Sequence, residues 1–101
     1  MNNFDIQNEG VIEIKKLCAK YGISLTELSM HLQVTWTRFY EIFSGKRRIT
    51  ADTDIRLCHF FKKDYGYFAK RQMEYDLQVG VRNLQDKLNN IKNIDEIIKR
   101  I

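Results

Sequence analysis

The sequence contains no proline and only five glycines in 101 residues, so it has few of the residues that interrupt regular secondary structure. Apolar residues recur every three or four positions almost throughout, which is the spacing of amphipathic helices and not of strands. These features predict an all-α fold. The length and the 44% hydrophobic content are enough for one compact domain with a modest core.

Long apolar runs and cysteine-rich patterns are also missing. No stretch approaches the roughly 18 uncharged apolar residues of a membrane-spanning helix, and the first residues lack the basic and apolar regions of a signal peptide. We therefore expect a cytoplasmic protein without a membrane partner. Cys18 and Cys58 each follow a leucine at apolar helical spacing, so we expect buried thiols and not a disulfide or a metal site.

Groups that support catalysis are scarce. His31 and His59 lie beside apolar helix positions without a carboxylate or cysteine at ligand spacing, and there is no glycine-rich phosphate loop. Nothing supplies a nucleophile with a base or a metal cage. We expect neither an enzyme nor a protein with a cofactor.

Positive charge is concentrated in the middle of the chain. Residues 34–63 carry seven Lys and Arg against three Asp and Glu, whereas residues 1–33 and 64–101 have net charges of −1 and +1. A local excess of basic charge attracts a phosphate backbone, although scattered surface lysines would give the same total. The place of these charges in the fold has to decide between the two interpretations.

Capping residues and apolar spacing predict where the first helices begin and end. We expect a first helix from about Glu9 to Lys20, preceded by a loose leader at residues 1–8 and ended at Gly22. Ser24 and Thr35 are placed to cap a second and a third helix, with a break of only two or three residues between them. Two short helices joined so tightly are typical of a helix-turn-helix.

A fourth helix is expected to close the core. Thr50 can cap it, and Asp52 and Asp54 would lie near its positive end. Its inward positions would be apolar, namely Ile55, Cys58 and Phe61.

The last third of the chain predicts a long helix from about Asp64 and a short one from Asn93. Apolar residues of the long helix alternate spacings of four and three, which makes a heptad seam: Leu77, Val81, Leu84, Leu88 and Ile91. Such a seam packs within the chain, in a dimer or, less commonly, against another protein. We divide the chain into a flexible leader at 1–8, a helix-turn-helix domain at 9–78 and a helical extension at 79–101.

The third helix has two unlike faces. Phe39, Ile42 and Phe43 are expected to point inward, whereas the outward positions are hydrogen-bonding, cationic or aromatic. Short polar side chains can approach phosphates or base edges, and the basic loop that follows can neutralise the flanking backbone. This profile favours DNA contacts from Ser24, Thr35, Trp36, Thr37, Arg38, Tyr40, Lys46, Arg47 and Arg48. The competing interpretation is a solubilising loop and a Trp36 that marks a packing surface.

Three stretches, in this order, resemble the HigA-type antitoxins within the larger XRE-like group of helix-turn-helix regulators. Residues 24–28 resemble the family's S-Q-x-E-L. Residues 44–57 (SGKRRITADTDIRL) are similar to its G-K-R-x-I-T-A-D-T-A-L-R-L run, which is the most specific of the three. Residues 72–77 resemble the later part of its L-Q-x-x-Y-D-L.

The resemblance implies a five-helix, lambda-repressor-like domain with a C-terminal helical extension. It implies a homodimer that binds operator DNA in its own promoter and neutralises a partner toxin, commonly an mRNA-cleaving enzyme of the HigB type. A dimer or partner surface would include Tyr67, Phe68, Arg71 and Tyr75. Among the positions that depart from the family pattern, two lie in or next to the helix-turn-helix. Leu25 stands where a Gln often holds the DNA backbone, and Gln33 replaces the turn glycine, so Gln33 is expected to adopt positive φ.

Two other functions stay open. A stand-alone or phage-type regulator would keep the DNA contacts without a toxin, and the neighbouring gene would discriminate it from an antitoxin. A protein-interaction module that has lost DNA binding would use Leu25, Trp36 and the heptad seam to dock another helix.

Overall fold

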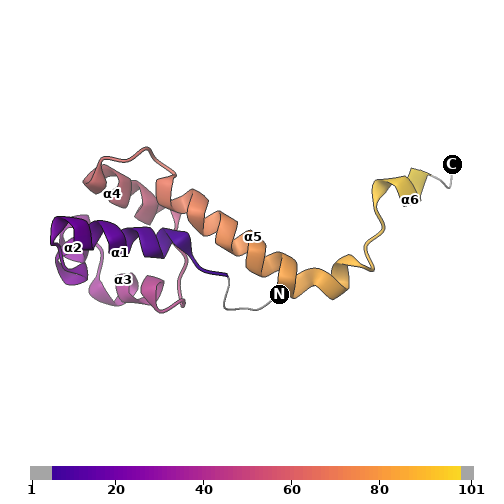
Figure 1. Cartoon of the computed structure of the whole chain (residues 1–101), viewed down its shortest axis with the longest axis horizontal. Helices are drawn as coiled ribbons and strands as arrows, with labels where there is room; N and C mark the ends of the chain where they lie inside the picture. Colours follow the sequence, from indigo (N-terminus) through magenta and orange to yellow (C-terminus); the bar gives the residue numbers. More distant parts are fainter. Residues whose placement is uncertain (1–5, 99–101) are drawn as a thin grey trace.

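The computed structural model describes residues 6–98 of the chain, which form helices and short connections without any strand, as predicted. The helices are α1 (Glu9–Tyr21), α2 (Leu25–Leu32), α3 (Trp36–Phe43), α4 (Ala51–Phe61), α5 (Tyr67–Leu88) and α6 (Ile94–Ile98). The first four helices and the beginning of α5 form one compact unit, in which α1 and α4 pack against α5 and α2 packs against α1, α3 and α4 (Figure 1). No helix within residues 6–98 is both long and apolar enough to cross a membrane. The ends of the predicted leader and extension, residues 1–5 and 99–101, lie outside the described residues.

The helices begin and end where the capping residues predict. The side-chain oxygens of Ser24, Thr35 and Thr50 each accept a hydrogen bond from the amide three residues on, at 3.0, 3.3 and 3.4 Å. These bonds satisfy amides that have no partner within the helix. Gly22 ends α1 in the left-handed conformation, with a φ of 67°. Local chemistry therefore accounts for the limits of the first four helices.

One core holds the first five helices together. Its fully buried side chains include one from each helix: Ile14, Leu28, Phe39, Leu57 and Phe68. Each helix contributes one apolar stripe to this core, so each of the five helices depends on packing against the others for its stability. α3 is fixed in this way by its inner face alone, which leaves its outer face free.

Asp54 lies in the first turn of α4, as predicted, and has a second role that the sequence did not reveal. Its buried carboxylate accepts hydrogen bonds from the amides of Gly66, Phe68 and Ala69, at 2.6, 2.9 and 2.8 Å. It therefore caps α5, whose own N-cap residue is a glycine without a side chain. Because Asp54 faces α5, the next residue turns outward, and the prediction that Ile55 is buried is wrong.

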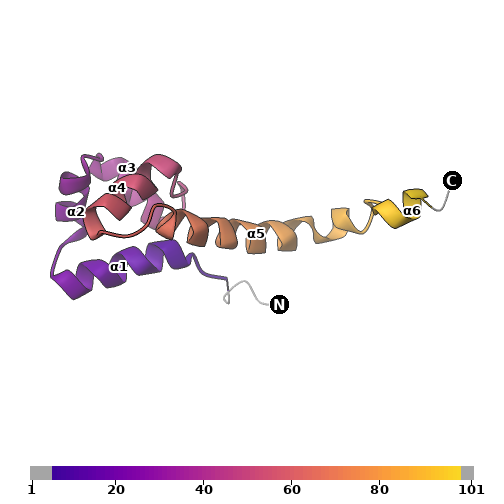
Figure 2. The same cartoon turned by 90° about the horizontal axis from the view of Figure 1, so that it is seen from above.

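The end of α5 and the whole of α6 leave the compact unit as an arm, which we define as residues 77–98 (Figures 1 and 2). The molecule extends 61 Å along its longest axis and 27 and 23 Å along the other two. The five seam residues on this arm are 41–66% exposed. The interpretation of the seam as intramolecular core is therefore wrong, and the seam is available to another chain.

Candidate nucleic-acid interface

α3 is packed on one face and bare on the other. Phe39 and Ile42 are buried, and the half-buried Phe43 makes an edge contact with Phe39 at 5.0 Å between ring centroids. The exposed residues of the opposite face are Thr35, Trp36, Thr37 and Tyr40. The predicted division of α3 into an apolar and a polar-aromatic face is confirmed.

The turn between α2 and α3 is tight and is braced by α4. Gln33 has φ 58° and ψ 40°, so the predicted positive φ at this position is confirmed. Arg56 of α4 donates hydrogen bonds from Nη1 to the carbonyl oxygens of Leu32 and Gln33, at 2.8 and 3.3 Å. The sequence analysis missed this role, because nothing local to Arg56 signals a contact with a turn 23 residues earlier.

The basic loop after α3 contains two engaged cations and one without a partner. Arg47 lies 3.6 Å from Glu41, and Arg48 donates from Nε to Asp76 of α5 at 2.7 Å. The side chain of Lys46 is exposed and makes no ion pair with any residue from 6 to 98. A guanidinium carries five N–H donors, so both arginines keep donors for a phosphate. The structure thus brings the three predicted cations together on one loop.

A buried glutamine holds this loop against the rest of the fold. The side-chain oxygen of Gln72 accepts from the Ile49 amide at 3.0 Å and from Asn8 Nδ2 at 2.8 Å. Its side-chain nitrogen donates to Asp76 at 2.9 Å. Gln72 thereby connects the N-terminus of α1, the loop before α4 and α5. Asn8, which we expected in a loose leader, is the N-cap of α1 and part of this network.

The side chains of Arg38 and Ser24 are less available for DNA contact than predicted. The side chain of Arg38 is half-buried, and its Nε is shielded from solvent without a hydrogen-bond partner in the described part of the chain. The hydroxyl of Ser24 is exposed but accepts from the Glu27 amide. Both residues lie at the N-terminal ends of their helices, where a ligand that approaches α2 and α3 together would meet them.

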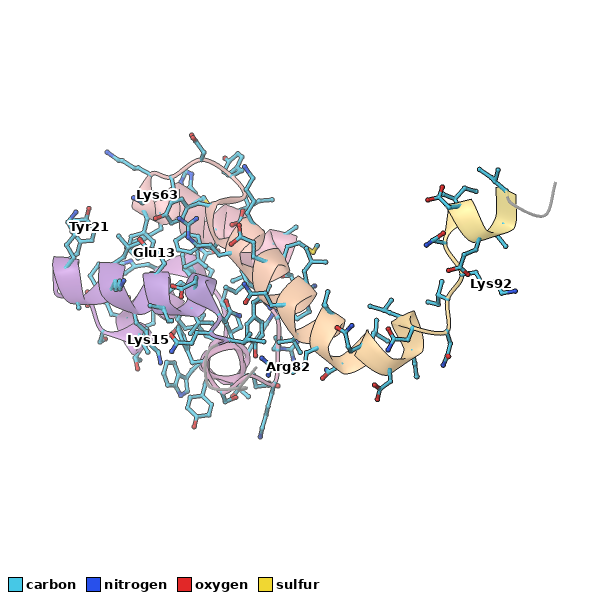
Figure 3. The ribbon with its side chains drawn as sticks, turned by 45° about the vertical axis from the view of Figure 1, so that its right-hand side comes forward. Glu13, Lys15, Tyr21, Lys63, Arg82 and Lys92 are labelled. Carbon is cyan, nitrogen blue, oxygen red and sulfur yellow. The ribbon has the colours of Figure 1, made fainter. Side chains whose placement is uncertain are left out.

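The predicted dimer or partner surface is largely used within the chain. Phe68 is 0% exposed, so its assignment to a partner surface is wrong. Tyr67 donates its hydroxyl proton to Glu13 at 2.8 Å, and this hydrogen bond raises the pKa of Tyr67. The Arg71 guanidinium lies 3.9 Å from the centroid of the Tyr67 ring. Figure 3 shows Glu13 on the side of α1 that carries this contact with α5.

Tyr75 differs from the other three residues of that predicted surface. It is half-buried and lines a groove of about 570 Å³ between α1, the basic loop and α5. Lys46, Arg48 and Asp76 line the same groove. Tyr75 is therefore placed beside the candidate interface as well as at the base of the arm.

Among residues 6–98, no three His, Cys, Asp or Glu side chains are grouped so that they could hold a metal ion. Cys18 and Cys58 are buried, as predicted, and burial raises the pKa of both thiols.

These features define a helix-turn-helix protein of the lambda-repressor-like class. Its fold is shared with an antitoxin HigA of Pseudomonas aeruginosa, solved with the higBA promoter, at a TM-score of 0.78 and 22% identity over 88% of this chain and 97% of that one. An addiction module antidote protein of a HigA family from Coxiella burnetii matches at a TM-score of 0.76 and 27% identity, over 87% and 96%. The chain has the fold of the HigA-type antitoxins, and the resemblance seen in the sequence is confirmed at this level.

Sequence comparison covers less of the chain. The virulence-associated protein I of Dichelobacter nodosus is 36% identical over 64 residues, which are 63% of this chain and 59% of that protein. The match thus spans less than two thirds of that relative's length, and its name identifies no chemistry. No protein-family model matches the chain.

Proposed function

We propose that this protein is a DNA-binding antitoxin that recognises operator DNA through α3 and represses its own operon. The observation that carries the proposal is the bare polar-aromatic face of α3 beside the basic loop. Lys46, Arg47 and Arg48 would contact phosphates and supply affinity, whereas side chains of α3 would contact base edges and supply sequence choice. The HigA of Pseudomonas aeruginosa, solved with promoter DNA, has the same fold and supports the proposal.

The proposal includes a homodimer that forms through the arm. A helix-turn-helix dimer places its two reading helices about 34 Å apart, one turn of DNA, and so reads both halves of a palindrome. The exposed heptad seam of α5 supplies a surface that a second copy can cover. An apolar stripe of this length is costly to leave in water, which favours its burial in an assembly.

Autorepression is tested with a reporter gene that is controlled by the DNA upstream of this reading frame. We expect the wild-type chain to repress the reporter at least about tenfold. Lys46→Ala should weaken repression, because the variant loses a phosphate contact and with it the favourable release of a counterion from the DNA. Lys16→Ala, an exposed cation of α1 outside the arm and the basic loop, is the matched control and should repress normally. Equal repression by all three proteins, or none by the wild type, contradicts the proposal.

Toxin neutralisation is the second part of the proposal and is supported by the shared fold with an addiction module antidote protein. It is tested by expressing the neighbouring reading frame alone and together with this chain. Growth arrest that this chain reverses, with co-purification of the two proteins, supports an antitoxin. Repression without any effect on growth favours the stand-alone regulator instead.

A protein-interaction module is the remaining candidate, and the exposure of Trp36 on α3 is the observation that favours it. In that case α3 would dock a protein and the basic loop would only increase solubility. The reporter experiment separates the two, because a module without DNA binding leaves the promoter fully active.

A further inference from the structure

We infer that Trp36 and Tyr40 form an apolar reader of thymine methyl groups, so that the operator half-site carries thymines opposite the first two turns of α3. The inference rests on the proposed DNA-binding function and names the base that this helix recognises. Its structural basis is the pair of exposed rings and the absence of Asn, Gln and Lys from α3, whose one arginine is half-buried.

The two rings make one continuous surface. Trp36 and Tyr40 are 43% and 55% exposed, and their ring centroids lie 5.9 Å apart at an interplanar angle of 44°. Residues four apart lie one above the other on the same side of a helix. The surface is at the N-terminal part of α3, which is the part that contacts base edges when such a helix enters the major groove.

The usual hydrogen-bonding readers are missing from this face. α3 contains no Asn, Gln or Lys, the groups that with Arg recognise adenine or guanine by paired hydrogen bonds. Its one arginine, Arg38, is half-buried, and Glu41 is engaged by Arg47. The apolar group that a base pair presents in the major groove is the C5-methyl of thymine. Contact with methyl groups is therefore what this surface is suited to.

The surroundings of the rings favour DNA over a protein as the occupant. Thr35 and Thr37 flank the pair with short hydroxyl side chains that can reach a phosphate or a base edge. The basic loop follows directly after α3, so its cations are placed at the C-terminal end of the helix that carries the rings. In a major groove, phosphates line the two edges and thymine methyl groups lie at the floor. The hydroxyl and basic side chains would contact the phosphates, and the rings would contact the methyl groups.

The experiment starts from duplexes that the wild-type chain selects out of a random-sequence DNA library. Each thymine of the selected half-site is then replaced by uracil, which lacks only the methyl group. We expect Kd to rise about fourfold at one or two positions, the effect of one buried methyl. Trp36→Ala and Tyr40→Ala should lose this discrimination, whereas Tyr40→Phe, which keeps the ring, should retain it.

Tyr65→Ala is the matched control, because Tyr65 is an exposed tyrosine of the loop between α4 and α5 and lines a pocket with the α2–α3 turn but with no residue of α3. It should bind and discriminate as the wild type does, and thermal unfolding checks that every variant is folded. A selected motif that tolerates uracil everywhere, or variants of Trp36 and Tyr40 that still discriminate, would overturn the inference. A library without any enriched motif would instead overturn the proposed function.

Discussion

Asp54 is a residue on which the arrangement of two helices depends. Its carboxylate is buried and accepts three backbone amides at the beginning of α5. We expect Asp54→Ala to lower the free energy of unfolding by about 3 kcal/mol, because it leaves buried N–H groups without an acceptor. Chemical denaturation measures the change. Asp52→Ala is the matched control: Asp52 is exposed and, within residues 6–98, forms an ion pair with Arg56 alone. Its loss should be about 0.5 kcal/mol or less, and equal losses would contradict the capping role.

Gln33 holds a conformation that glycine adopts without strain. We expect Gln33→Gly to raise the free energy of unfolding by about 1 kcal/mol, because its φ of 58° costs a residue with a Cβ roughly that much. Gln33→Ala keeps the Cβ and should give no gain. Chemical denaturation of the two variants in parallel measures the difference in their free energies of unfolding. Equal stability of both would show that the turn carries no such strain.

These two residues show what local sequence can and cannot predict. The positive φ of Gln33 was predicted from the resemblance, because Gln33 stands where the family has the glycine of the turn. Asp54 caps a helix that begins 13 residues later, and only the packing of α4 against α5 reveals this. The buried contacts of Gln72 and the bracing of the turn by Arg56 also join segments that are far apart in the sequence, so local patterns did not predict them.

At the scale of helices, the arm of residues 77–98 carries the proposed dimer contact. We expect Leu84→Asp to convert a dimer into a monomer, because it places a charge in the middle of the heptad seam. Light scattering after size-exclusion chromatography measures the mass. Asn83→Asp introduces the same charge at the neighbouring exposed position off the seam and should stay dimeric. A wild-type monomer at all concentrations would contradict the assignment.

The elements themselves were predictable because their signals are local. Caps at Ser24, Thr35 and Thr50 fixed three helix beginnings, and apolar spacing distinguished the two faces of α3. The heptad seam was also recognised, but spacing does not identify the partner that covers it. The structure removes one alternative, because the seam lies outside the core of its own chain.

For the molecule as a whole, stability is expected to decline at alkaline pH. Burial raises the pKa of Cys18 and Cys58 above their ordinary 9.0, and a hydrogen bond to Glu13 raises that of Tyr67 above 10.0. The unfolded chain therefore ionises before the folded chain, so the stability present below pH 9 is lost as the pH rises further. Denaturation at pH 7 and about pH 10 measures this. Cys18→Ala/Cys58→Ala should depend less on pH, and an equal dependence would contradict the cause.

The identity of the operator and of any toxin is not contained in the fold. Many proteins share one helix-turn-helix frame and differ in the exposed residues of one helix. The sequence located that helix and its cations, whereas the structure showed that Arg38 is half-buried and that Arg47 and Arg48 are already paired. Binding experiments on this chain's own upstream DNA therefore carry the most information.

The most direct test is the affinity of the purified protein for the duplex upstream of its own reading frame, beside a scrambled duplex, at about 50 and 200 mM salt. We predict binding that is at least about a hundredfold tighter to its own duplex, weakens steeply with salt, and loses about one unit of salt slope in Lys46→Ala. Equal binding to both duplexes, or none to either, would contradict DNA recognition by α3 and the basic loop.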